Sequence, residues 1–313
     1  MSPTASSEPQ PGRRADFADV EPFGTRLAAA VAARGPLCVG IDPHRELLLD
    51  WGVGDDVDGL RRFTDAVVEA LAGSVAVLKP QMAFYERFGS RGIAVLEEAV
   101  TAIRAAGALV LLDAKRGDIG STMDAYGEYL RSDHPLKVDA LTVSPYLGPQ
   151  SLEPARSTAQ RFGGGLFVLA RTSNPDAGTF QHARLPDGGG KGVAQAVVDT
   201  VRGWNTPDWV FGDPMPTIAD VRERRSTWSG PTGSFGVVVG ATLPELDVDL
   251  DGLGGPVLAP GLGAQGGSPA DLRRLFGRDR AVVPTVSRGV LSAGSEIGAL
   301  RAAADRWAAE LAP

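Results

Sequence analysis

The sequence predicts a (β/α)8 barrel, because short apolar runs alternate with segments of helical periodicity along most of its 313 residues. Each run is rich in Val, Leu, Ile and Ala, which is typical of a strand buried on both faces. An open doubly wound sheet is less favoured, because no GxGxxG turn follows the first run. The eight runs are residues 37–42, 75–80, 109–115, 140–145, 165–172, 235–242, 256–263 and 281–288.

Apolar residues recur at helical spacing between most of these runs. The clearest helical segments are residues 59–73, 91–107, 192–204, 268–277 and 296–312. A similar pattern at residues 23–35 precedes the first strand, and we expect this extra helix to close the bottom of the barrel. The sequence therefore predicts one barrel domain at residues 22–313, after a disordered polar tail at residues 1–21.

One segment, residues 203–233, breaks the alternation between the fifth helix and the sixth strand. It is rich in Pro and contains Trp204, Trp209 and Trp228. A connection of this length is commonly a lid, an interface or a mobile loop. Its tryptophans could anchor a partner subunit, or the insertion could simply pack locally; the sequence leaves both open.

The composition predicts a soluble cytoplasmic protein, with 43% hydrophobic and 22% charged residues. A net charge of −7 gives no overall basic field for nucleic acid or anionic lipid. No apolar run approaches the roughly 18 residues of a membrane span. The single cysteine, Cys38, excludes an internal disulfide and fits a reducing compartment. The three histidines share no metal-binding spacing, so we expect no metal site.

Charged residues lie at the ends of the predicted second and third strands and on the loop after the third. Asp113 and Lys115 are two positions apart and therefore share one face of the third strand. Lys79 ends the neighbouring strand, and Asp118 lies on the loop after the third. A structural ion-pair network is possible, but such networks contribute little net stability. Because barrel active sites lie at the carboxyl ends of strands, a catalytic array is favoured.

The loops after the last two strands are rich in glycine. They comprise residues 259–267 and 286–291, and the second contains Arg288. Loops at these positions commonly bind phosphate through backbone N–H groups, and a guanidinium adds a planar, permanently charged fork. The sequence therefore predicts a phosphorylated ligand.

The segment DAKRGDIGST at residues 113–122 resembles the Asp-x-Lys-x-x-Asp signature of the orotidine 5′-phosphate decarboxylase family. The resemblance covers roughly residues 22–310 and is strongest to the longer bacterial branch. The insertion, the tail, His44 and Arg45 depart from the family pattern. The other motifs that agree in order and spacing are CVGIDPH, VLKPQMAFYE, TVSPYLG, ARTSNPDAG, VVVGAT, APGLGAQGG and SRGVL.

The resemblance implies decarboxylation of orotidine 5′-phosphate to UMP and CO2, the last step of de novo pyrimidine nucleotide synthesis, with no cofactor or metal. Lys115 is the implied general acid, which protonates C6 and stabilises the developing carbanion. Asp113 would lie beside the leaving carboxylate and orient Lys115. Lys79 and Asp42 would bind the ribose.

The family pattern also implies a homodimer. Its second Asp and the Thr four residues later come from the partner subunit, and these positions are Asp118 and Thr122 here. Two composite sites per dimer would result. Ile119 would form part of the apolar pocket that receives CO2.

The remaining implied contacts recognise the base and the phosphate. Ser173 matches the serine that contacts the pyrimidine amide edge, and Gln265 and Arg288 match the phosphate grip. Ser287 or Gly289 would add a backbone N–H. The glycine-rich loop after the seventh strand would be a mobile lid.

Three alternatives stay open at this point. A magnesium-dependent sugar-phosphate decarboxylase or aldol-type synthase uses the same third-strand motif. A Schiff-base aldolase would use Lys79 or Lys115 as its amine. A non-catalytic sensor of phosphoribosyl ligands would bind UMP without turning over orotidine 5′-phosphate.

Overall fold

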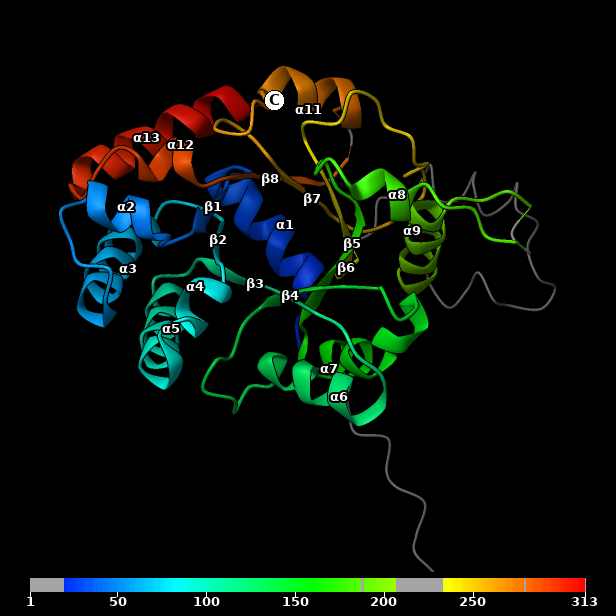
Figure 1. The fold of residues 1–313 in the computed structure, drawn as a ribbon, viewed down its shortest axis with the longest axis horizontal. Helices are drawn as coiled ribbons and strands as arrows, with labels where there is room; N and C mark the ends of the chain where they lie inside the picture. Colours follow the sequence, from blue (N-terminus) through cyan, green and yellow to red (C-terminus); the bar gives the residue numbers. More distant parts are fainter. Residues whose placement is uncertain (1–19, 187–188, 207–232, 279, 313) are drawn as a thin grey trace, which may run out of the picture.

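The computed structural model describes residues 20–186, 189–206, 233–278 and 280–312. Its strands form a closed parallel barrel, in which each strand pairs with its neighbours in sequence and the last pairs with the first (Figure 1). The predicted barrel is confirmed, with each strand inside or within one residue of its predicted run. The strands are β1 Cys38–Ile41, β2 Val77–Pro80, β3 Leu109–Arg116, β4 Ala140–Val143, β5 Gly165–Arg171, β6 Phe235–Val239, β7 Val257–Pro260 and β8 Val282–Val286.

Helices connect the strands and cover the outside of the barrel (Figure 1). The predicted helical segments are confirmed to within about two residues, and α11 begins with a capping box between Ser268 and Asp271. The helices are α1 Phe23–Arg34, α2 Arg45–Asp50, α3 Val57–Leu71, α4 Ala83–Glu86, α5 Gly89–Ala105, α6 Gly120–Gly127, η1 Glu128–Leu130, η2 Pro149–Leu152, α7 Glu153–Phe162, α8 Ala177–Gln181, α9 Val193–Trp204, α11 Pro269–Phe276, α12 Arg288–Leu291 and α13 Ile297–Leu311.

The first helix, α1, closes the amino-terminal end of the barrel, as the sequence predicts. Phe23 and Leu27 belong to the same buried cluster as barrel residues such as Cys38 and Leu111. The Phe23 ring lies beside β5, where a Cβ on Gly165 would stand only 2.3 Å from it. A functional site can therefore form only at the opposite end of the barrel, where the carboxyl ends of the strands lie.

The predicted tail at residues 1–21 and insertion at residues 203–233 lie mostly outside the described residues, as do Trp209 and Trp228. Trp204 is described: it ends α9 and packs edge-on against Phe235, with ring centroids 5.7 Å apart. For this one tryptophan the structure favours local packing. Within the described ranges, no helix is both long and apolar enough to cross a bilayer.

Candidate active site

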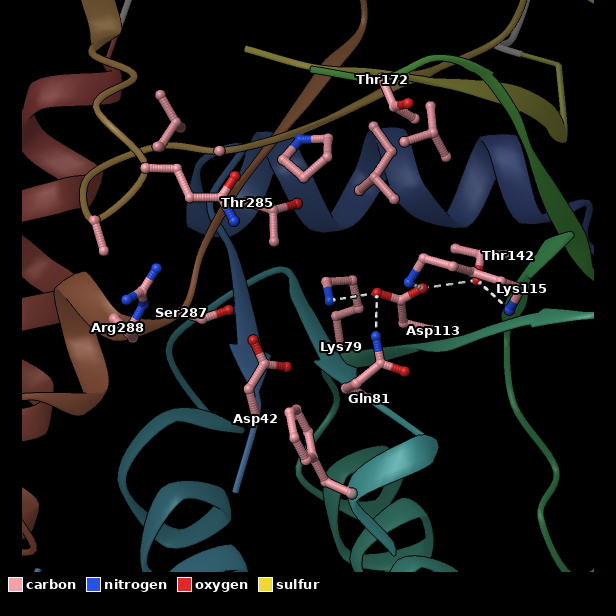
Figure 2. Close-up of a pocket in the computed structure, with 18 of the residues that line it drawn as sticks. Asp42, Lys79, Gln81, Asp113, Lys115, Thr142, Thr172, Thr285, Ser287 and Arg288 are labelled. Atoms are coloured by element: carbon pink, nitrogen blue, oxygen red, sulfur yellow. Dashed lines mark hydrogen bonds and ion pairs between the residues drawn. The ribbon is translucent and has the colours of Figure 1, made fainter. Parts of the chain in front are cut away.

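A cavity of about 460 Å³ opens at the carboxyl ends of the strands. Both halves of the predicted site contribute to it: the charged array comes from β2 and β3, and the residues predicted to bind phosphate come from the loops after β7 and β8 (Figure 2). The predicted site residues that line the cavity are Asp42, Lys79, Asp113, Lys115, Gln265 and Arg288.

The Asp113 carboxylate is the centre of the charged array, and donors surround both of its oxygens (Figure 2). Its Oδ2 accepts from Lys79 Nζ at 2.9 Å and from Gln81 Nε2 at 3.0 Å. Its Oδ1 accepts from Lys115 Nζ at 2.7 Å and from Thr142 Oγ1 at 2.9 Å. A carboxylate held by four donors keeps one orientation and holds both lysines in place.

The array is charged despite its burial. Burial by itself would raise the pKa of Asp113, but the ammonium groups of Lys79 and Lys115 outweigh it and hold this pKa well below its ordinary range. Burial by itself would lower the pKa of Lys79, but Asp113 and Asp42 raise it above its ordinary range. Near neutral pH the cavity therefore contains an ionised Lys79–Asp113 pair.

Lys115 departs from regular strand geometry. Among the described non-glycine residues it alone has a positive φ, of 48°. Its backbone N–H donates to Thr142 Oγ1 at 2.9 Å, and the β3–β4 register shifts between Leu112 and Arg116. Such a conformation costs about 1–3 kcal/mol and is typical of functional residues. The lysine side chain remains 46% exposed and faces the cavity.

The other side of the cavity carries features of an anion site. The loop after β7 turns tightly at Gly261 and Gly263, which have φ values of 114° and 72°, and it presents Gln265. Arg288 begins α12, and no carboxylate within the described residues pairs with it. Figure 2 shows Arg288 across the cavity from Asp113. An anion could satisfy this guanidinium.

Three unpartnered polar atoms also lie in the cavity wall. They are Asp42 Oδ1, His44 Nδ1 and Thr285 Oγ1, each buried without a hydrogen-bond partner in the structure. Buried polar atoms of this kind are normally satisfied by a ligand or by water. No group of three or more His, Cys, Asp or Glu side chains suited to a metal ion occurs among the described residues.

Four predicted site residues do not line the cavity within one chain. Asp118 Oδ1 accepts from Ile119 N at 2.8 Å on the loop after β3, and Ile119 is 63% exposed. Thr122 is exposed on α6, and Ser173 is exposed beside Gly240. The structure therefore separates Asp118, Ile119, Thr122 and Ser173 from the Lys79–Asp113–Lys115 array.

The structure adds cavity residues that the sequence analysis did not assign. Gln81 lies two positions after Lys79, so it shares the face that points at Asp113. Thr142 and Thr285 are buried polar residues inside apolar strands. A polar side chain in such a strand is the signal that could have identified both threonines.

A parallel eight-stranded barrel with an ionised lysine–aspartate array at the carboxyl ends of its strands defines a barrel enzyme. The chain belongs to the orotidine 5′-phosphate decarboxylase / HUMPS family, whose model matches residues 35–303.

Relatives of known name support this assignment along nearly the whole chain. The Streptomyces coelicolor protein named orotidine 5′-phosphate decarboxylase is 56% identical over 294 residues, which cover 93% of this chain and 98% of that protein. The Salinispora arenicola protein of the same name is 55% identical and covers 93% and 97%. A crystal structure of a Streptomyces avermitilis homologue, at 55% identity, covers 96% and 98% with a TM-score of 0.84.

Proposed function

We infer that this protein decarboxylates orotidine 5′-phosphate to UMP and CO2, the last step of de novo pyrimidine nucleotide synthesis, without a cofactor. The observation that carries this inference is the Lys79–Asp113–Lys115 array, opposite Arg288, in a chain 56% identical to a protein of that name. A biosynthetic role and the free thiol of Cys38 favour a cytoplasmic location. Neither nucleic acid nor membrane is a proposed partner.

Lys115 is the proposed general acid. As the carboxylate at C6 leaves as CO2, negative charge develops on C6, and the ammonium stabilises it. Lys115 then transfers its proton to C6 and becomes a neutral amine. Asp113, 2.7 Å from Lys115 Nζ, keeps the ammonium oriented before the reaction.

Binding groups on either side of the array hold the substrate. Asp42, with its unpartnered Oδ1, would accept a hydrogen bond from a ribose hydroxyl, and Lys79 would donate to the same sugar. Gln265 and Arg288 would bind the phosphate. Because the phosphate is remote from C6, its binding energy can organise the loops around the reacting carbon. Ser173 would contact the pyrimidine after its loop moves inward.

We further propose a homodimer in which Asp118 and Thr122 complete the partner's site and Ile119 lines its CO2 pocket. Exposed apolar side chains on the loops after β3 and β4 and on α8 support this arrangement, because a second copy would cover them. Tyr146 and Phe180 stack with ring centroids 5.2 Å apart. The set comprises Ile119, Tyr146, Leu147 and Phe180.

A mixing experiment tests the composite site. A Lys115→Ala chain and an Asp118→Ala chain are each expected to be inactive alone. When the two chains are mixed and allowed to exchange subunits, half of the dimers become heterodimers. Each heterodimer has one intact site of its two, so about a quarter of the wild-type activity should return. An inactive mixture, after exchange is verified, would refute the shared site.

The proposed reaction is tested by following the ultraviolet absorbance of orotidine 5′-phosphate in the presence of EDTA. We expect loss of substrate that is metal-independent and abolished by Lys115→Ala. Sensitivity to EDTA would instead favour the magnesium-dependent relatives, and borohydride trapping of a carbonyl substrate would favour a Schiff-base aldolase. Tight UMP binding without turnover would indicate a sensor.

A further inference from the structure

The short helix α12, which begins with Arg288, lies between two tryptophans. A helix of four residues cannot hold itself together, so tertiary contacts must fix it. At its carboxyl end, Trp51 Nε1 donates to the Leu291 carbonyl at 2.9 Å. At its amino end, Trp307 lies so close that a Cβ on Gly289 would stand 2.8 Å from the indole Nε1.

Trp307 also lies against the loop after β7, which carries Gln265. A Cβ on Gly263 would stand 3.0 Å from Trp307 Cζ2 and 3.9 Å from Gly289 Cα. The two phosphate-side loops therefore lie against the same indole. Both positions are glycine, and a side chain at either would press against Trp307.

The helix that carries Trp307 is itself well anchored. Leu300 of α13 is fully buried, and Arg301 Nε donates to the Ala70 carbonyl of α3 at 2.9 Å. Trp307 packs partly buried on the main hydrophobic core, and it does not line the cavity. The indole is thus a fixed support outside the site and does not contact a ligand there.

We propose that Trp307 is a positioning residue for the phosphate site. It holds the loop of Gln265 and the start of α12 at a fixed separation, so that Gln265 and Arg288 engage the same phosphate. This inference rests on the proposed function, since that function supplies the phosphorylated substrate.

The test compares Trp307→Leu with Trp204→Leu, which removes a second partly buried tryptophan at the end of α9, packed on Phe235. Affinities for UMP and uridine separate the phosphate from the rest of the ligand. We expect Trp307→Leu to lower UMP affinity, and kcat/KM for orotidine 5′-phosphate, by about 10- to 100-fold. Uridine affinity should stay within about twofold of wild type, and Trp204→Leu should resemble wild type throughout.

Equal losses for UMP and uridine in Trp307→Leu would overturn the positioning role, and so would unchanged UMP affinity. If the wild-type protein binds UMP but does not decarboxylate orotidine 5′-phosphate, the proposed function fails, while the comparison of UMP with uridine still decides the role of Trp307. If Trp307→Leu does not fold, Trp307→Phe takes its place in every measurement.

A double-mutant cycle with Gly289→Ala tests the contact itself. In the wild-type background the new methyl group presses on the indole, so UMP affinity should fall. In the Trp307→Leu background the same methyl group should cost less, because the indole is gone and only Val286 Cγ1, 2.9 Å from the new Cβ, remains in its way. Strictly additive losses of UMP affinity would show that Gly289 and Trp307 do not interact and would overturn the proposal.

Discussion

Gly40 lies in β1 beneath the cavity, and the absence of its side chain makes room for two cavity residues. A Cβ at this position would stand 2.0 Å from Ser287 Oγ and 3.1 Å from Asp42 Oδ2. We expect Gly40→Ala to displace both side chains and lower kcat/KM by about 10- to 100-fold. Gly73→Ala is the matched control, because a Cβ on Gly73 would meet nothing within 4 Å. Equal kinetics for the two variants would contradict this account of Gly40.

We expect the Lys115 side chain to be needed for turnover but to contribute little to the stability of the fold. Its side chain is 46% exposed, and without it Asp113 keeps Lys79, Gln81 and Thr142 as donors. Lys115→Ala should therefore abolish turnover while changing the free energy of unfolding by no more than about 1 kcal/mol. Turnover assays and denaturant titrations of the same preparation measure both quantities. Turnover near the wild-type rate would overturn the proposed mechanism.

At the scale of the element, β3 shows what the sequence can predict. The apolar run and the two-residue spacing of Asp113 and Lys115 follow from strand periodicity, and both are present in the structure. The positive φ of Lys115 and the shifted register do not follow from it. They occur together with a contact between strands, in which Thr142 of β4 accepts from Lys115 N, and no periodicity encodes that contact.

The loop after β3 shows a second limit to what can be predicted from the sequence. The roles predicted for Asp118, Ile119 and Thr122 require a second copy of the chain, so their geometry cannot be read from one copy. Conversely, Gln81 contacts Asp113 directly, yet a single polar residue just after a strand carries no distinctive signal on its own. Barrel topology was predictable because it needs only the alternation of runs; the site also needs contacts between strands.

The short helix α8 fixes the loop after β5. Gln181 Oε1 accepts from Thr172 N at 2.9 Å, and Gln181 Nε2 donates to Thr172 Oγ1 at 2.7 Å. Thr172 lines the cavity and precedes Ser173. Loss of two hydrogen bonds, each worth about 1 kcal/mol, should release this loop, and Gln181→Ala should raise KM about tenfold.

Steady-state kinetics with orotidine 5′-phosphate measure this change. Gln160→Ala, an exposed position on the outer helix α7, is the control for the loss of a glutamine side chain. An unchanged KM for Gln181→Ala would mean that the loop holds its position without this pair of hydrogen bonds.

At the scale of the whole molecule, one thiol reports on the integrity of the barrel. Cys38 is the only cysteine, it is fully buried inside the barrel, and burial raises its pKa to about 12. A thiol reagent at pH 8 can therefore react only after the barrel opens. Phe23 of α1 packs in the same buried cluster, edge-on against Phe167 with ring centroids 6.0 Å apart.

Phe23→Ala should accelerate labelling of Cys38, because loss of a buried phenyl group costs about 3–5 kcal/mol and opening becomes about a hundredfold or more frequent. UMP should slow labelling in both proteins, because a ligand that binds only the closed barrel stabilises it. Phe162→Ala, on the outer helix α7, is the control and should label much more slowly than Phe23→Ala. Labelling of the native wild-type chain as fast as that of the unfolded chain would show that α1 does not close the barrel in solution.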